Sequence, residues 1–236
     1  MDCEVTREAL YESNEAASQL YEASLQSSLG KRALDYLHQR AFTDKTLQHF
    51  RIGYAPAGMH VAFKALHQEQ GIPTQTLLAA GILKKHEESG HLSDVFHDRI
   101  TFPLQDYRGI VGFTARTLGN PPKSEDPDAL RMPKYINTHT TNIYQKSKFW
   151  YNEEPALKAA RESEKLFLVE GPTSVMRASQ HNLEYFVCSC GTSITEEQIA
   201  SLRKRFPQGD LILCTDGDDA GQRAAEKILS HSLQYG

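Results

Sequence analysis

Three aspartates stand close together near the end of the sequence, one residue after the apolar run "LILC". Asp216, Asp218 and Asp219 lie within four positions of one another. Carboxylates this close raise one another's pKa values unless a cation neutralises their charge. The cluster therefore predicts a bound cation at Asp216 and Asp218. Asp219 is better explained as the N-cap of a following helix, a common use of aspartate.

An acidic residue also follows another apolar run. Glu170 comes directly after "KLFLV", and Asp216 comes just after "LILC". From residue 165 onwards, strand-like runs (165–170, 184–189 and 210–214) alternate with helical segments (172–181, 195–206 and 218–233). This alternation is typical of a parallel sheet covered by helices, which binds ligands beyond the carboxyl ends of its strands. If the two strands are neighbours, Glu170, Asp216 and Asp218 share one site. Magnesium suits such oxygen ligands.

A glycine and a helix N-terminus follow the strand 184–189 and add a predicted phosphate-binding position to the site. Gly191 follows the strand 184–189 and precedes the helix 195–206, so its backbone N–H could lie near a phosphate. Thr195 and Gln198 match a capping box at the start of that helix. The Ser189–Ser193 region contains no Gly-x-Ser-x-Gly elbow, so a hydrolase triad is not expected.

The N-terminal part has a different pattern. Residues 6–50 read as helices interrupted at Gly30, residues 60–70 and 73–81 as two short helices, and 99–117 as two strands joined by a turn at 106–109. Four prolines in 119–133 predict an exposed loop, and Pro155 should start a helix that ends near Glu164. We therefore expect an α/β protein with a mixed α/β subdomain over 1–150 and a parallel-sheet domain over 151–236.

Composition excludes several classes of protein. No apolar run approaches the roughly 20 residues of a membrane span, and the acidic N-terminus is no secretory signal, so a cytoplasmic protein with no membrane partner is expected. Cys3, Cys188, Cys190 and Cys214 form no Cys-x-x-Cys pair. His86, His91 and His97 fit no tight metal motif. The sequence thus predicts no zinc site, and cysteines that act as small buried hydrophobic residues.

One stretch combines cations with aromatic rings. The net charge is −4, yet residues 129–152 contain four Lys or Arg residues, five aromatic residues and no acid. Such a segment suits phosphates and unstacked bases. The alternative, a basic surface loop with a few rings buried in the core, stays equally open at this point.

Several ordered motifs resemble a known family. "VEG" at a strand end, then "CGTSITEEQ" and "DGDDAGQRAA", resemble the TOPRIM domain of primases, topoisomerases and some nucleases. Upstream, "LDYLHQRAFTDKTLQHFRIGYAP", "DRITFPLQDYRGIVGFTARTLGN" and "PKYINTHTTNIYQKSKFWY" resemble the RNA polymerase core of bacterial DnaG-type primases. The resemblance begins near residue 8 and covers nearly the whole chain.

The resemblance implies specific roles. Glu170, Asp216 and Asp218 would carry Mg²⁺, which Mn²⁺ could replace, and promote synthesis of short RNA primers from ribonucleoside triphosphates on a single-stranded DNA template. The implied nucleotide and template contacts are Arg40, Arg99, Arg116, Lys134, Tyr135, Asn137 and Lys146. The replicative helicase would bind only through a C-terminal domain that these 236 residues do not contain.

Departures from the family pattern leave alternatives. Ser174 replaces the aspartate that the family usually has four residues after its first glutamate, which weakens one metal site. The loop 119–133 is longer than usual. The family's zinc-binding domain and third acidic motif have no counterpart here, so we expect a fragment of a longer primase. The alternatives are a reduced primase-like module that only binds single-stranded DNA, and a TOPRIM nuclease.

Overall fold

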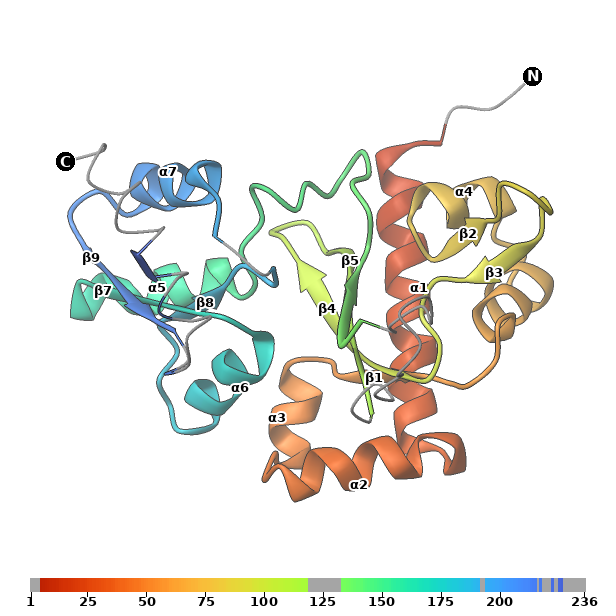
Figure 1. Ribbon diagram of the computed structural model, residues 1–236, viewed down its shortest axis with the longest axis horizontal. Coiled ribbons are helices and arrows are strands. Elements are labelled where there is room, and N and C mark those ends of the chain that lie inside the picture. The colour runs from red at the N-terminus through yellow and green to blue at the C-terminus, as the bar shows by residue number, and fades with distance from the viewer. Residues whose placement is uncertain are drawn as a thin grey trace. The chain divides into compact units, whose positions relative to one another are not determined.

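The chain folds into two compact units, residues 1–143 and 144–236, each with its own hydrophobic core. The computed structural model describes residues 5–118, 133–191, 194–215, 217, 222, 225 and 226 (Figure 1). The sequence placed the division after residue 150. The two compact units divide between Ile143 and Tyr144, and the fully buried Trp150 belongs to the core of the second one.

Helices form most of the first half of unit 1. They are α1 (Arg7–Gln26), the 3₁₀ turn η1 (Ser28–Gly30), α2 (Lys31–Gln39), α3 (Asp44–His49), the π-helix η2 (Phe63–Glu69) and α4 (Thr74–Ala79). Side chains of Thr6 and Thr43 cap α1 and α3, as threonine does at N-caps. The prediction of helices over 6–50 with a break at Gly30 is confirmed.

Unit 1 also contains a four-stranded antiparallel sheet in the order β1-β4-β5-β6. Its strands are β1 (Gly53–Ala55), β4 (Arg99–Gln105), β5 (Ile110–Thr117) and β6 (Tyr135–Asn137), and a separate pair joins β2 (Leu83–Lys85) to β3 (Leu92–Asp94). The predicted β4–β5 hairpin is confirmed. Asp106 Oδ1 closes its turn by accepting from the N–H groups of Arg108 (2.8 Å) and Gly109 (3.0 Å).

Helix α1 and strand β1 approach each other closely in unit 1. Gly53 lies so near α1 that an added Cβ would be 2.6 Å from Tyr21 Cβ and 2.7 Å from the Tyr21 carbonyl carbon. Tyr21 is buried and packs edge-on against Phe113 of β5, with ring centroids 5.4 Å apart. Glycine at position 53 therefore allows α1 to lie on the sheet.

Unit 2 is a three-stranded parallel sheet with helices on both faces. The strand order is β8-β7-β9, from β7 (Lys165–Val169), β8 (Phe186–Cys188) and β9 (Asp210–Cys214). The helices are α5 (Glu153–Ser163), α6 (Pro172–Gln180) and α7 (Glu196–Arg205). In Figure 1, α6 and α7 lie on opposite sides of the sheet. The predicted parallel arrangement is confirmed, whereas the predicted helix 218–233 and loop 119–133 lie almost wholly outside the described residues.

Two local predictions for unit 2 need correction. Helix α5 begins at Glu153, so Pro155 is its third residue rather than its first. Proline is tolerated there because the N–H groups of a first helical turn have no partner within the helix. Cys188 and Cys190 are buried, as expected, but Cys214 is exposed, because it ends the edge strand β9.

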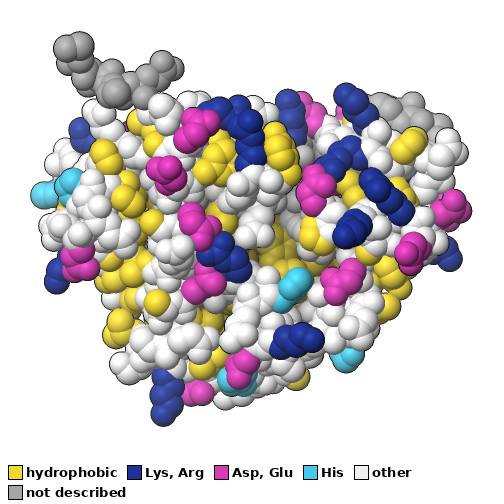
Figure 2. All heavy atoms as spheres, turned by 180° about the vertical axis from the view of Figure 1, so that it is seen from behind, with side chains coloured by type: hydrophobic (Ala, Val, Ile, Leu, Met, Phe, Trp, Pro, Cys, Tyr) yellow, Lys and Arg dark blue, Asp and Glu magenta, His cyan; other side chains and the backbone are white. Residues whose placement is uncertain are grey.

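Charges of both signs are mixed on the surface. On the face drawn in Figure 2, Lys and Arg side chains lie among Asp and Glu side chains. This agrees with the small net charge of −4. Functional cations must therefore be identified from local geometry rather than from one large basic surface. Among the helices that the structure describes, none is both long and apolar enough to cross a membrane.

The α1–β1 contact gives a stability prediction. Gly53→Ala should lower the free energy of unfolding by about 1–3 kcal/mol, because the new methyl group overlaps Tyr21. Urea unfolding followed by circular dichroism measures the change. Gly171→Ala is the control: its φ is −138° and an added Cβ meets nothing within 4 Å. Equal stabilities of the two variants would contradict the close packing.

Candidate functional site

The carboxyl ends of the three strands of unit 2 meet at one edge of the sheet. Val169, the last residue of β7, pairs with Cys188 of β8 on one side and with Cys214 of β9 on the other. The residues that follow these strand ends, Glu170 and Thr215 among them, therefore leave the sheet at the same level. The strands 165–169 and 210–214 are neighbours, which is the condition on which the shared site depended.

Glu170 is the one predicted metal ligand that the structure describes, since Asp216 and Asp218 lie outside the described residues. Its side chain is exposed between the end of β7 and the start of α6. Ser174, in the first turn of α6, is exposed as well. Among the described residues, no three His, Cys, Asp or Glu side chains form a group that could hold a metal ion. A complete ligand set thus requires the aspartates after β9.

A buried glutamine fixes the segment that carries Lys146. Gln198, only 1% exposed, donates from Nε2 to the carbonyl oxygens of Phe149 (2.8 Å) and Lys146 (3.3 Å). The backbone carbonyl oxygen of Gln198 accepts from Trp150 Nε1 (3.0 Å). Gln198 and Thr195 also form the predicted capping box. The sequence revealed the cap, but not that the same side chain positions Lys146.

Lys146 lies near the end of β8. The pKa of the Cys190 thiol is raised well above its usual range, most of all by a hydrogen bond with Cys188 and second by burial. The positive charge of Lys146 opposes this shift, so Lys146 lies close to Cys190, two residues after the end of β8. Cys190 adopts a φ of 52°, and the N–H of Gly191 points to Ser189 Oγ at 3.4 Å. Because β8 pairs directly with β7, Lys146, Gly191 and Glu170 all belong to the carboxyl edge of this sheet.

Unit 1 brings three predicted contact residues together around Tyr36 of α2. The Cζ atom of Arg116 lies 4.9 Å from the centroid of the Tyr36 ring and 6.0 Å from that of Tyr135, and Arg40 Cζ lies 5.9 Å from that of Tyr36. Arg116 Nη1 also donates to the Tyr36 hydroxyl. We call Tyr36, Arg40, Arg116 and Tyr135 the arginine–tyrosine cluster. Tyr36 was not predicted from the sequence, although its spacing of four from Arg40 places both on one face of a helix.

Arg99 is buried beneath the segment that carries Lys134 and Tyr135. Only 3% exposed, its Nη1 donates to the carbonyl oxygens of Pro133 (3.0 Å) and, at longer range, Ala115 (3.4 Å). Burial lowers its pKa from the usual arginine value. The guanidinium thus supports the backbone that precedes β6, and Lys134 on that backbone is exposed.

β6 itself was not expected as a strand. It pairs with β5 through Arg116 opposite Tyr135 and Thr114 opposite the half-buried Asn137. This pairing places Tyr135 beside Arg116. A strand of three residues is too short to show an alternating pattern, so the sequence carried no signal for it.

Two family descriptions match the chain. "DNA primase catalytic core, N-terminal domain" matches residues 20–157, and "Toprim-like" matches residues 167–235. The DNA primase of Staphylococcus aureus is 34% identical over 229 residues, which are 96% of this chain and 36% of that protein. The DNA primase of Salmonella typhimurium is 34% identical over 230 residues, 97% of this chain and 37% of that protein. The chain therefore spans little more than a third of these relatives.

Solved structures match both units. The RNA polymerase domain of Mycobacterium tuberculosis primase DnaG aligns with a TM-score of 0.83 at 33% identity, covering 95% of this chain and 72% of that one. A DnaG primase catalytic domain bound to single-stranded DNA aligns with a TM-score of 0.79 at 32% identity, covering 97% of this chain and 68% of that one. These likenesses agree with the α/β fold class expected from the sequence.

The positioning role of Gln198 can be tested by fluorescence, because Trp150, the only tryptophan in the sequence, is hydrogen-bonded to Gln198. Gln198→Leu leaves the carbonyl oxygens of Lys146 and Phe149 without their donor, which should cost about 1–3 kcal/mol of stability. We expect Trp150 fluorescence to shift to the red as the segment loosens. Gln145→Leu, at an exposed neighbouring position, should change neither property. An unchanged emission spectrum in the Gln198 variant would contradict the positioning role.

Proposed function

The chain belongs to the family of DnaG-type bacterial DNA primase catalytic cores, and from this membership we propose that it synthesises short RNA primers on single-stranded DNA. The reaction joins ribonucleotides: a 3′-hydroxyl attacks the α-phosphate of a ribonucleoside triphosphate, and pyrophosphate leaves. The observation that carries the proposal is the shared carboxyl edge of β7 and β9, where Glu170 and Thr215 leave the sheet at one level. In the sequence, Asp216 comes directly after Thr215.

Acidic residues at that edge suit phosphoryl transfer. Glu170, Asp216 and Asp218 would hold Mg²⁺, with Mn²⁺ as a substitute. Bound there, the ion would neutralise charge on the attacking and leaving oxygens. The exposed carboxylate of Glu170 is consistent with this donor set, because Mg²⁺ prefers oxygen ligands and keeps several waters.

Lys146 and Gly191 are proposed to bind the triphosphate at the same edge. Lys146 supplies a positive charge near the end of β8, on a segment that Gln198 holds in place. Gly191 offers a turn without a side chain, where a phosphate can approach the backbone. Orienting the triphosphate by fixed groups lowers the barrier, since less freedom is lost in the transition state.

The template is proposed to bind the arginine–tyrosine cluster together with Lys134 and Asn137. Arg40 and Arg116 provide charge for the phosphates, and the rings of Tyr36 and Tyr135 provide faces on which bases can stack. We assign Arg99 a positioning role, since it supports the backbone of Lys134 from beneath. A similar DnaG primase catalytic domain was solved bound to single-stranded DNA, which supports single-stranded DNA as the ligand.

The remaining assignments are proposals for the longer proteins to which this region corresponds. We propose that such a protein acts in the cytoplasm, and that the replicative helicase binds it through a domain outside these 236 residues. Within this chain, residues 1–150 would contribute mainly template contacts and residues 151–236 the metal ligands.

A second candidate function is a module that binds single-stranded DNA without chemistry. Ser174 favours it, because this position would supply an additional carboxylate in the family pattern. Incubation with single-stranded DNA, Mg²⁺ and ribonucleoside triphosphates separates the candidates on one denaturing gel. RNA products indicate the primase, binding without products the module, and cleavage of DNA without nucleotides a nuclease.

Glu170→Gln tests the acidic edge. The substitution keeps the size of the side chain but removes its charge, so extension of an RNA primer on a DNA template should fall about a hundredfold or more. Glu162→Gln, at an exposed position on α5, is the matched control and should keep full activity. Primer extension by the Glu170 variant at the control rate would refute the assigned role.

Arg116→Met tests the arginine–tyrosine cluster. Loss of one phosphate contact should weaken the affinity for a single-stranded oligonucleotide about fivefold or more and lower the slope of log affinity against log salt by about one. Tyr36→Phe keeps the ring but loses the hydroxyl that accepts from Arg116, so its effect should be smaller. Lys64→Met, at an exposed position on η2, serves as the control. An unaltered salt slope in the Arg116 variant would contradict a phosphate contact.

A further inference from the structure

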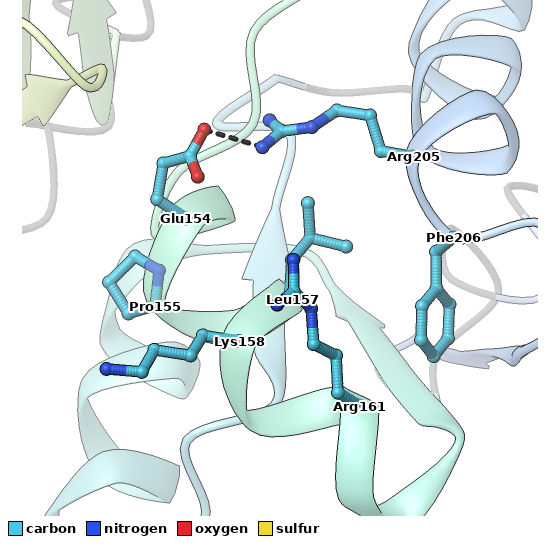
Figure 3. Close-up of a pocket in the computed structure, with 7 residues that line it drawn as sticks. All are labelled: Glu154, Pro155, Leu157, Lys158, Arg161, Arg205 and Phe206. Carbon is cyan, nitrogen blue, oxygen red and sulfur yellow. Dashed lines mark hydrogen bonds and ion pairs between the residues drawn. The ribbon is translucent and has the colours of Figure 1, made fainter.

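A cavity of about 700 Å³ lies between α5 and the end of α7, on the side of unit 2 that carries its apolar core (Figure 3). We call it the α5–α7 groove. It is bounded by residues 154–161 of α5 and by Arg205 and Phe206. Gln198, in the first turn of α7, donates a hydrogen bond to the backbone of Lys146, whereas Arg205 is the last residue of α7. The ten residues of α7 separate these two ends by about 15 Å, so the groove is distinct from the carboxyl edge.

Two cations in the groove have no carboxylate partner among the residues that the structure describes. Lys158 and Arg161 are three residues apart on α5, so they share one face of the helix, and both are exposed. Neither forms an ion pair with any carboxylate that the structure describes. In Figure 3 the two side chains extend in different directions, so each can pair with a separate carboxylate of an anionic ligand.

The third cation, Arg205, has a different role, because it forms ion pairs that join α7 to α5. Its guanidinium nitrogens lie 3.0 Å from Glu153 Oε2 and 2.6 Å from Glu154 Oε1. Burial raises the pKa of Glu153, and the charge of Arg205 opposes that shift. The pair Glu154–Arg205, drawn with a dashed line in Figure 3, therefore closes one end of the groove and leaves Lys158 and Arg161 for a ligand.

The apolar part of the groove is held rigidly. Leu157 and Phe206 are 7% and 8% exposed. Gly209 packs directly on the Phe206 ring, since an added Cβ would lie 1.8 Å from Cε1. Arg203 Nη1 donates to the Gly209 carbonyl oxygen at 2.7 Å and fixes the turn that makes this contact. The groove is thus formed in advance, which reduces the cost of ordering on binding.

We propose that the α5–α7 groove binds an acidic peptide segment of a partner protein. Carboxylates of the peptide would pair with Lys158 and Arg161, and an apolar side chain would lie against Leu157 and Phe206. The volume is within the usual range of roughly 300–1,000 Å³ for ligand sites. A nucleic-acid strand fits less well, because its sugar-phosphate backbone has no apolar side chain to lie against Leu157 and Phe206.

The test uses a short fluorescein-labelled peptide of Asp and Glu residues around a central Leu, with binding measured by fluorescence anisotropy on the whole chain. We expect Lys158→Glu/Arg161→Glu to weaken binding about tenfold or more. Lys204→Glu removes an exposed cation of α7 outside the groove and should leave the affinity unchanged. A peptide with Asn and Gln in place of the acids should bind weakly to every variant.

Three outcomes would overturn the proposal. They are no binding of the acidic peptide up to about 1 mM, equal binding of the neutral peptide, and equal affinity of the groove variant and the wild type. A single-stranded oligonucleotide that loses affinity in the groove variant, while the peptide does not, would assign the groove to nucleic acid instead. The milder Lys158→Gln/Arg161→Gln variant repeats the comparison if the charge reversal impairs folding, which Trp150 emission reports.

Discussion

The parallel pairing of β7 with a strand on each side is the constraint from which the arrangement of the second unit follows. Val169 is opposite Cys188 and Cys214, so the chain segments after all three strands begin at one level. Parallel strands need crossover helices, which cover both faces and leave only the strand ends accessible. Glu170 is exposed for this reason. A shift of one residue in this register would turn the side chains of β7 to the opposite face and move Glu170 out of level with Thr215.

Both units use one buried polar side chain to hold a segment that carries an exposed lysine. Gln198 binds the backbone near Lys146, and Arg99 binds the backbone near Lys134. Burying an amide or a guanidinium is unfavourable unless its hydrogen bonds are satisfied. Carbonyl oxygens of the neighbouring segment satisfy them in both cases, so the segment is fixed in the same step. The lysines can then act from rigid backbone without being buried themselves.

Cations that bind an anionic ligand must remain uncompensated within the protein, and the two units achieve this differently. In the arginine–tyrosine cluster, Arg116 lies against the rings of Tyr36 and Tyr135, which stabilise its charge without neutralising it. In the α5–α7 groove, Glu153 and Glu154 are engaged by Arg205, so Lys158 and Arg161 keep their charge. Each arrangement keeps positive charge available for an anionic ligand.

The sequence by itself determined the features whose signals are local. Apolar runs that alternate with helical segments predicted the parallel strands. Thr195 and Gln198 predicted a helix cap, and the position of Glu170 after "KLFLV" predicted an acidic residue at a strand end. Tertiary structure alone decided the features that join distant segments: Tyr36 beside Arg116, the carbonyl partners of Arg99, the three-residue strands, and the groove between α5 and α7. The physical reason is range, since helix and strand periods record only the residues a few positions away, whereas these contacts depend on which segments the fold brings together.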